Sequence, residues 1–204
     1  MFIERQPQTW YDRKVHVTHR VKFQRLAWLY QLVLTWDHAY PDPQFKKLEE
    51  FQERGLEASL GARIPEEHLD DLERSVGAAL KGWAQRASSG PLMPELLRLT
   101  EEAGLQWARA QWSAQSRARL KTPGEVFEAF LESPWMPVPG EARVTIDRRS
   151  PHEVIHALPE IAQRSSETAA VLIAWSRGFA TSFAGAVVPE TTSDQRLRWV
   201  ARSS

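Results

Sequence analysis

The 204-residue sequence contains no cysteine, and this absence excludes several kinds of chemistry. Without cysteine there are no disulfides, no thiolate nucleophiles, and no zinc or iron–sulfur sites that need sulfur ligands. The N-terminal residues also lack the positive start, apolar stretch and small-residue cleavage site of a secretory signal. We therefore expect a cytoplasmic protein.

Long apolar runs are absent as well. The most apolar stretch, LAWLYQLVLTW, covers residues 26–36 and is interrupted by Gln31 and Thr35. A helix needs about 20 apolar residues to span a bilayer. We therefore expect no membrane partner.

Neither sign of charge is in excess, because 26 Lys and Arg residues balance 26 Asp and Glu residues. No global field draws such a chain to nucleic acid or to an anionic surface. Basic residues do gather before the acidic segment PEEHLDDLE, but no glycine-punctuated helix-turn-helix signature accompanies them. We expect no nucleic-acid partner.

Apolar residues recur at helical spacing through the first two thirds of the chain. This periodicity predicts helices over about 17–36, 43–60, from Pro65 to the SSGPLMP segment, and over about 94–120. The first of these is apolar on nearly its whole circumference, so we expect it to be buried. The segment TPGE predicts a capping box, with Thr122 as N-cap and Glu125 at the third helical position.

The periodicity changes from 3.6 to 2 after SPWMPVPGE. Ala142, Val144 and Ile146 alternate with polar residues, which predicts a half-buried strand. SPHE at 150–153 predicts a second capping box and a short helix that ends at Pro159. A long helix then ends at Gly185, and a closing hairpin places Leu197 and Trp199 on one face.

These patterns predict an α+β fold. A helical N-terminal portion covers residues 1–90, and a mixed α/β domain with a small antiparallel sheet and a C-terminal hairpin covers 91–204. The alternative is that both parts form one continuous domain.

The segment HEVIH at 152–156 matches the H-E-x-x-H zinc motif. On a helix, His152 and His156 would stand one turn apart, and Glu153 would polarise a zinc-bound water. However, Pro151 places Glu153 in the first helical turn, where it is better explained as the capping partner of Ser150 than as a general base.

Zinc also needs a third protein ligand, and neither Glu160 nor Glu167 stands at a spacing typical of zinc hydrolases. We therefore expect no metal, no other cofactor and no catalytic residue. His152 and His156 remain the alternative metal ligands.

Nine tryptophans are an unusual number for this length, although core packing is the default explanation of each. Trp175 and Arg177 leave their helix about 200° apart, so the tryptophan should pack inward, against the helix that carries Trp107 or across the sheet, and the arginine should face elsewhere. The guanidinium suits an anionic ligand or a carboxylate, and a surface ion pair is the alternative. The candidate ligand-binding residues are Trp107, His152, His156, Trp175, Arg177 and Trp199.

The order of segments EEAGLQWARAQW, FEAFLES, ARVTID, RSPHEVIHALPEI, AWSRGFATSF and RLRWV resembles a known family. Over residues 95–204 it is similar to the L-2-amino-thiazoline-4-carboxylate hydrolase-like proteins and the related 4-vinyl reductase-like ligand-binding domains. The hydrolase-like relatives typically carry a Cys-Pro pair after the strand, where this chain has Ser150 and Pro151. The resemblance therefore implies a ligand-binding scaffold, often dimeric, without the thiol chemistry.

These observations favour a non-catalytic module that binds a small molecule or a protein partner and forms a homodimer. The alternative is a small-molecule hydrolase that uses His152, Glu153 and His156, with or without zinc.

Overall fold

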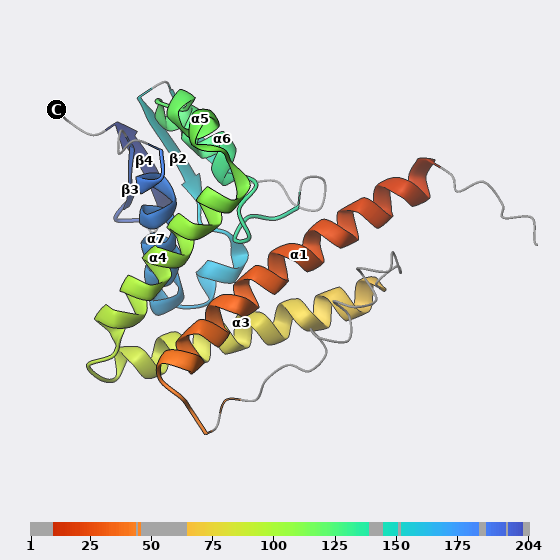
Figure 1. The fold of residues 1–204 in the computed structure, drawn as a ribbon, viewed down its shortest axis with the longest axis vertical. Helices are drawn as coiled ribbons and strands as arrows, with labels where there is room; N and C mark the ends of the chain where they lie inside the picture. Colours follow the sequence, from red (N-terminus) through yellow and green to blue (C-terminus); the bar gives the residue numbers. More distant parts are fainter. Residues whose placement is uncertain are drawn as a thin grey trace, which may run out of the picture.

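A computed structural model describes residues 10–43, 45, 65–138, 145–150, 152–183, 187–194 and 196–201. It shows an α+β fold, as predicted, in which helices dominate and a small antiparallel sheet lies toward the C-terminus (Figure 1). The elements are α1 (Trp10–Ala39), α3 (Glu66–Ser88), α4 (Met93–Gln111), α5 (Ala114–Arg119), α6 (Pro123–Phe130), β1 (Ile146–Arg149), β2 (Glu153–Ala157), the 3-10 helix η1 (Glu160–Arg164), α7 (Ser166–Thr181), β3 (Val187–Thr191) and β4 (Arg196–Ala201).

The long helices α1 and α3 lie side by side (Figure 1). Of the eight large apolar residues expected to bury α1, Trp28 is 41% exposed and the other seven are buried: Phe23, Leu26, Leu29, Tyr30, Leu32, Val33 and Trp36. The predicted α3 stripe is buried throughout: Leu69, Leu72, Val76, Leu80 and Trp83. The helix expected over 43–60 lies outside the described residues, except for Pro43 and Phe45.

The single helix predicted over 94–120 is wrong, because the chain breaks into α4 and α5. Trp112 has an extended backbone, and the Ser113 hydroxyl accepts a hydrogen bond from the Ser116 amide at 3.1 Å. A serine that caps a new helix competes with continuation of the old one. The capping box at α6 is confirmed, since the Thr122 and Glu125 side chains each bond the other residue's backbone amide.

Helices α4 and α7 cross with their backbones in direct contact. A Cβ atom added at Gly104 would lie 2.1 Å from the Trp175 carbonyl oxygen, and one at Gly178 would lie 1.7 Å from the Glu101 carbonyl oxygen. Only glycine permits this approach. The crossing explains why Gly178 interrupts an otherwise apolar helix.

The four strands form one antiparallel sheet in the order β1-β2-β4-β3. Its inner face carries buried residues of the two central strands, namely Val154, His156, Leu197 and Trp199, and α6 and α7 pack against the sheet. The predicted burial of Leu197 and Trp199 is confirmed. The first strand lies later than the alternation predicted, at Ile146–Arg149, and Ile146 is exposed; residues 142–144 lie outside the described part of the chain.

The short helix predicted at HEVIH is wrong, because these residues form strand β2 and the turn before it. Ser150 and Glu153 close a turn between β1 and β2, with the Ser150 amide donating to the Glu153 carbonyl at 2.7 Å. The Ser150 hydroxyl accepts from the Glu153 amide at 3.1 Å, as an N-cap would. A serine followed by a turn therefore gives the same local hydrogen bond in a hairpin as in a capped helix.

The closing hairpin is confirmed, and among the described strands β3 lies at the edge of the sheet and pairs with β4 alone. Pro189 stands in this edge strand opposite Trp199. Buried apolar side chains from the helical part and from the sheet form one continuous core. Among the described helices, none has the length and apolarity needed to traverse a bilayer.

Candidate functional site

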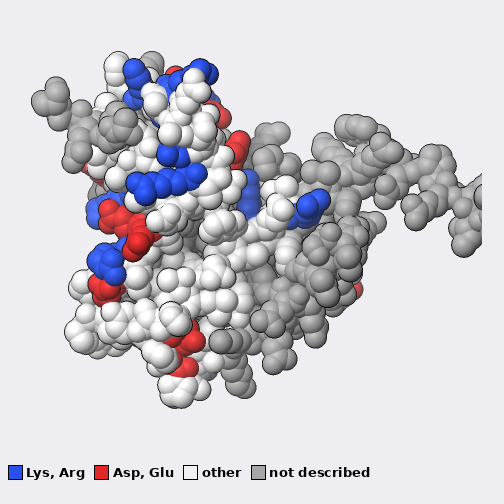
Figure 2. Space-filling model, in the orientation of Figure 1, with Lys and Arg blue, Asp and Glu red and all other residues white. Residues whose placement is uncertain are grey.

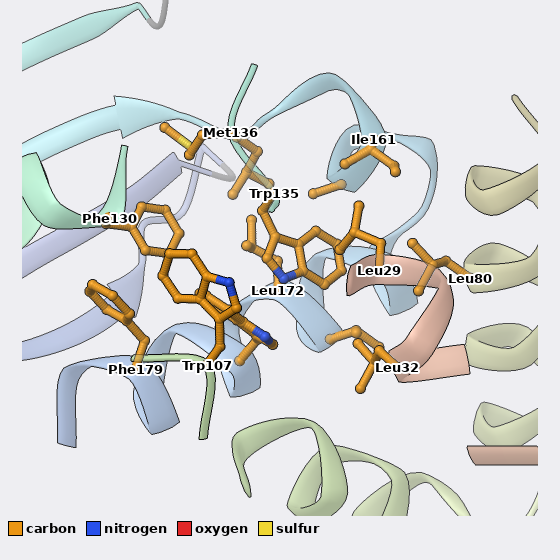
Figure 3. Close-up of a cluster of buried hydrophobic side chains, with 14 of the residues drawn as sticks. Leu29, Leu32, Leu80, Trp107, Phe130, Trp135, Met136, Ile161, Leu172 and Phe179 are labelled. Carbon is orange, nitrogen blue, oxygen red and sulfur yellow. The ribbon is translucent and has the colours of Figure 1, made fainter. Parts of the chain in front are cut away.

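Four of the six candidate residues from the sequence lie together in a buried aromatic cluster. Figure 3 shows part of it, with Trp107 beside Phe130 and Phe179. Trp175 packs inward against the helix that carries Trp107, which was one of the two predicted arrangements, and its ring centroid lies 5.2 Å from that of Trp107. The other two members are Trp199, whose ring centroid is 4.7 Å from that of Phe130, and His156.

His156 is held in this core by a hydrogen bond on each ring nitrogen. The Trp199 indole donates to Nε2 at 3.1 Å, so Nδ1 carries the proton and donates to the Ala157 carbonyl at 2.7 Å. The ring also lies 4.8 Å from that of Phe127. Burial disfavours the charged imidazolium and lowers the pKa of His156 from 6.5 to about 4, although the bond to Ala157 acts in the opposite direction. His156 is thus a neutral core residue with both nitrogens occupied.

The hairpin separates the two histidines of HEVIH. His152 lies in the exposed turn, whereas His156 lies in the core. The Glu153 carboxylate accepts from Arg198 Nε on β4 at 2.6 Å rather than capping Ser150, so the predicted capping box is wrong. In the part of the chain that the structure describes, no three His, Asp or Glu side chains are grouped to hold a metal. This geometry does not favour the hydrolase alternative.

Arg177 lies on the exposed side of α7, away from the buried Trp175, as their spacing predicts. Its backbone carbonyl accepts from the Thr181 hydroxyl at 2.8 Å. Of the six candidate residues, only Trp175 contributes to the wall of either pocket described below.

The larger pocket, of about 420 Å³, lies between α1, the segment 134–138 and the end of β2 with η1. Most of its wall is apolar and comes from segments far apart in the sequence: Leu26, Leu29, Trp135, Met136, Val138, Leu158 and Ile161. In Figure 3, Trp135 lies between Leu29 of α1 and Leu172 of α7. The proline-containing segment 134–138 thus places Trp135 and Met136 beside α1.

The two cations in this wall, Lys22 and Arg25, are bonded to other parts of the protein. The Arg25 guanidinium donates to the carbonyls of Met136 at 2.6 Å, Pro137 at 2.7 Å and Leu131 at 3.2 Å, and so ties α1 to the segment 131–138. Lys22 pairs with Asp70 at 2.9 Å and with Glu73 at 3.2 Å, both on α3. The pocket therefore has a rigid polar side next to its apolar walls.

A smaller pocket of about 270 Å³ lies between α1 and α4, with Trp175 of α7 in its wall. The half-exposed Trp28 stands on the α1 side, and Leu99 and Ala103 on the α4 side. Leu29 and Pro134 line both pockets, so the two pockets adjoin at these residues.

A comparison of the chain with protein-family models, with curated proteins and with solved structures finds no match. The assignment of a function therefore rests on the chemistry of these two pockets.

The sequence analysis missed most of the pocket residues. Arg25 is a charged residue close to the apolar run of α1, and such a position is a signal of a specific buried partner. The second signal is SPWMPVP, in which large apolar side chains stand among three prolines; it was interpreted only as the end of a helical region. Neither signal reveals which residue lies opposite in the folded chain, because Arg25 and Met136 are 111 positions apart in the sequence.

Proposed function

We propose that the chain is a non-catalytic module that binds a small molecule in the larger pocket. The observation that carries this proposal is a pocket of about 420 Å³ with largely apolar walls and a few fixed polar groups. Pockets that bind small molecules typically have volumes of about 300 to 1,000 Å³ and this mixture of walls.

Three polar side chains of the pocket, Lys22, Arg25 and Gln163, support binding rather than chemistry. Lys22 and Arg25 are committed to bonds that hold α1 against α3 and against the segment 131–138. The Gln163 amide is likewise used, since it donates to the Leu158 carbonyl at 2.5 Å. Groups held in this way orient a ligand, whereas a general acid or base must be able to exchange its proton with the substrate.

The resemblance of residues 95–204 to 4-vinyl reductase-like domains is part of the same proposal, since ligand binding is the activity that it implies. The homodimer, the cytoplasmic location and the lack of a nucleic-acid partner also stay predictions. Light scattering on the purified chain tests the first of these, with a dimer mass as the expected result.

Binding of N-phenylnaphthylamine, an uncharged apolar dye, tests the proposed site. We expect saturable binding of one dye per chain to the wild-type protein, with a rise in dye fluorescence. Ala157 lines the pocket at the end of β2, so Ala157→Phe should fill it and weaken dye binding at least tenfold.

The matched control is Ala201→Phe, which adds the same bulk at the exposed end of β4. It should leave dye binding within twofold of the wild-type value. Equal binding by both variants, at unchanged thermal stability, would refute the site.

A further inference from the structure

We propose that the two pockets are the two ends of one site, and that this site takes an elongated, uncharged amphipathic molecule. Its polar head would lie in the larger pocket and its apolar chain would pass Leu29 into the cleft between α1 and α4. This inference rests on the proposed function, because it extends the same site.

The first argument is the shared partition. Leu29 and Pro134 each contribute to the walls of both pockets, so the two pockets adjoin and these residues are part of the partition. Leucine can change rotamer at small cost, whereas a backbone wall cannot move aside so easily. A chain that displaces the Leu29 side chain therefore enters the smaller pocket directly.

The second argument is that α1 forms one wall along the whole length of the site. Lys22, Arg25, Leu26 and Leu29 line the larger pocket, and Trp28, Leu32 and Thr35 continue along the smaller one. From Lys22 to Thr35 a helix rises about 20 Å, at about 1.5 Å per residue. A site of this shape suits a chain and not a compact molecule.

The third argument concerns charge. In the larger pocket, Lys22 and Arg25 are balanced by Glu73 and Glu160, and both cations are already bonded to the protein. A carboxylate head would have to compete with Asp70 and Glu73 for Lys22 while it lost its own water. An uncharged head that donates and accepts hydrogen bonds meets neither penalty.

The smaller pocket suits the apolar end. Its walls include Trp28, Leu32, Leu99 and Trp175, and the small residue Ala103 leaves room on the α4 side. Figure 2 shows an area of uncharged residues where α4 and the C-terminal half of α1 lie side by side in Figure 1, with acidic and basic groups at its border. The apolar end therefore reaches a surface region of low charge.

A chain-length series of primary alcohols, measured by displacement of N-phenylnaphthylamine, tests the inference. For the wild-type protein, affinity should rise by about fourfold per methylene from hexanol to tetradecanol. In Ala103→Phe the new ring fills the cleft, so affinity should stop rising at about octanol, while hexanol binds as before. Leu99→Phe fills the same cleft from one turn earlier and should act alike.

The matched control is Ala110→Phe on the exposed face of α4, which should keep the full chain-length dependence. If Ala103→Phe and Leu99→Phe, both folded, also keep it, the joined site is wrong and the proposed function stands. If the dye does not bind in the larger pocket at all, the proposed function itself fails.

The head group is tested at fixed chain length with decanol, decanoate and decyltrimethylammonium. We expect decanol to bind at least tenfold more tightly than either charged molecule. Tighter binding of decanoate or of the ammonium would overturn the assignment of an uncharged head.

Discussion

Backbone meets backbone where α4 crosses α7, whereas α1 meets the segment 131–138 through side chains. At the crossing, Gly104 and Gly178 let the two backbones approach closely, and rings of the aromatic cluster pack beside them. At α1, Arg25 binds backbone carbonyls of the segment 131–138, and Leu29 lines both pockets. The two glycines leave no space for a ligand at the crossing, whereas pockets lie along α1 from Lys22 to Thr35.

The difference is one of geometry more than of hydrophobicity. Both contacts bury tryptophans, but Trp175 lies against a neighbouring helix with no gap at the glycines, whereas Trp135 comes from an irregular segment that contains prolines. Two regular helices can pack closely over several turns. A helix and an irregular segment touch at a few points, and the gaps between those points become pockets.

The largest effect is expected from breaking the close crossing with Gly178→Ala. The added methyl group cannot fit beside the Glu101 carbonyl, so the helices must separate, and we expect the free energy of unfolding to fall by about 3 kcal/mol. Urea denaturation measures it. In the control Gly82→Ala, the new atom meets only the Arg86 side chain at 3.9 Å, so a gain of about 0.5 to 1 kcal/mol is expected. A small loss in Gly178→Ala would show that the crossing tolerates separation.

The burial of His156 in the core beside the crossing should make the free energy of unfolding depend on pH. Its pKa is 6.5 in the unfolded chain and about 4 in the folded one, so unfolding takes up a proton between these values. Stability is fully present above pH 6.5 and falls as the pH drops toward 4, by up to about 3 kcal/mol in total.

Urea denaturation of the wild-type protein and of His156→Phe between pH 7 and pH 4 isolates this contribution. The variant should be less stable at pH 7, because the Trp199 indole loses its acceptor, but its stability should depend less on pH. Parallel pH curves for the two proteins would show that water reaches the histidine.

A smaller effect is expected at the α1 contact. Arg25→Met keeps much of the apolar stem but removes three hydrogen bonds to the segment 131–138, and we expect a loss of about 2 kcal/mol in the free energy of unfolding. The control Arg20→Met changes an exposed position of the same helix and should stay within about 0.5 kcal/mol of wild type. Equal stabilities in urea denaturation would mean that the three Arg25 hydrogen bonds add no net stability to this contact.

Elements that depend on local patterns were predictable. The apolar stripe of α3, with Leu69 through Trp83 at helical spacing, and the Thr122–Glu125 capping box both follow from residues a few positions apart. The β2 strand was not, because Ser150 makes the same hydrogen bond in a hairpin turn as in a helix cap. The decisive partner of His156 is Trp199, which is 43 positions away.

The candidate site was missed for the same reason. Tryptophans attract attention in a sequence, but Trp107 and Trp199 serve the core, and the pocket is built from Arg25, Leu29 and Trp135. The Arg25 side chain brings α1 and the segment 131–138 together, because it donates hydrogen bonds to backbone carbonyls of that segment. Every residue has a backbone carbonyl, so the residue types in a sequence do not show which carbonyls accept such bonds.

Pro189 has a consequence for how copies of the chain can associate. An edge strand normally offers a row of amides and carbonyls on which a strand of another molecule can align. Proline has no amide hydrogen to offer, and Pro189 stands third of five residues in β3. A strand from another molecule that aligned along β3 would find no amide hydrogen at Pro189, the middle residue of this strand. An ordered β-aggregate is therefore disfavoured at this edge, and self-association is directed to other surfaces.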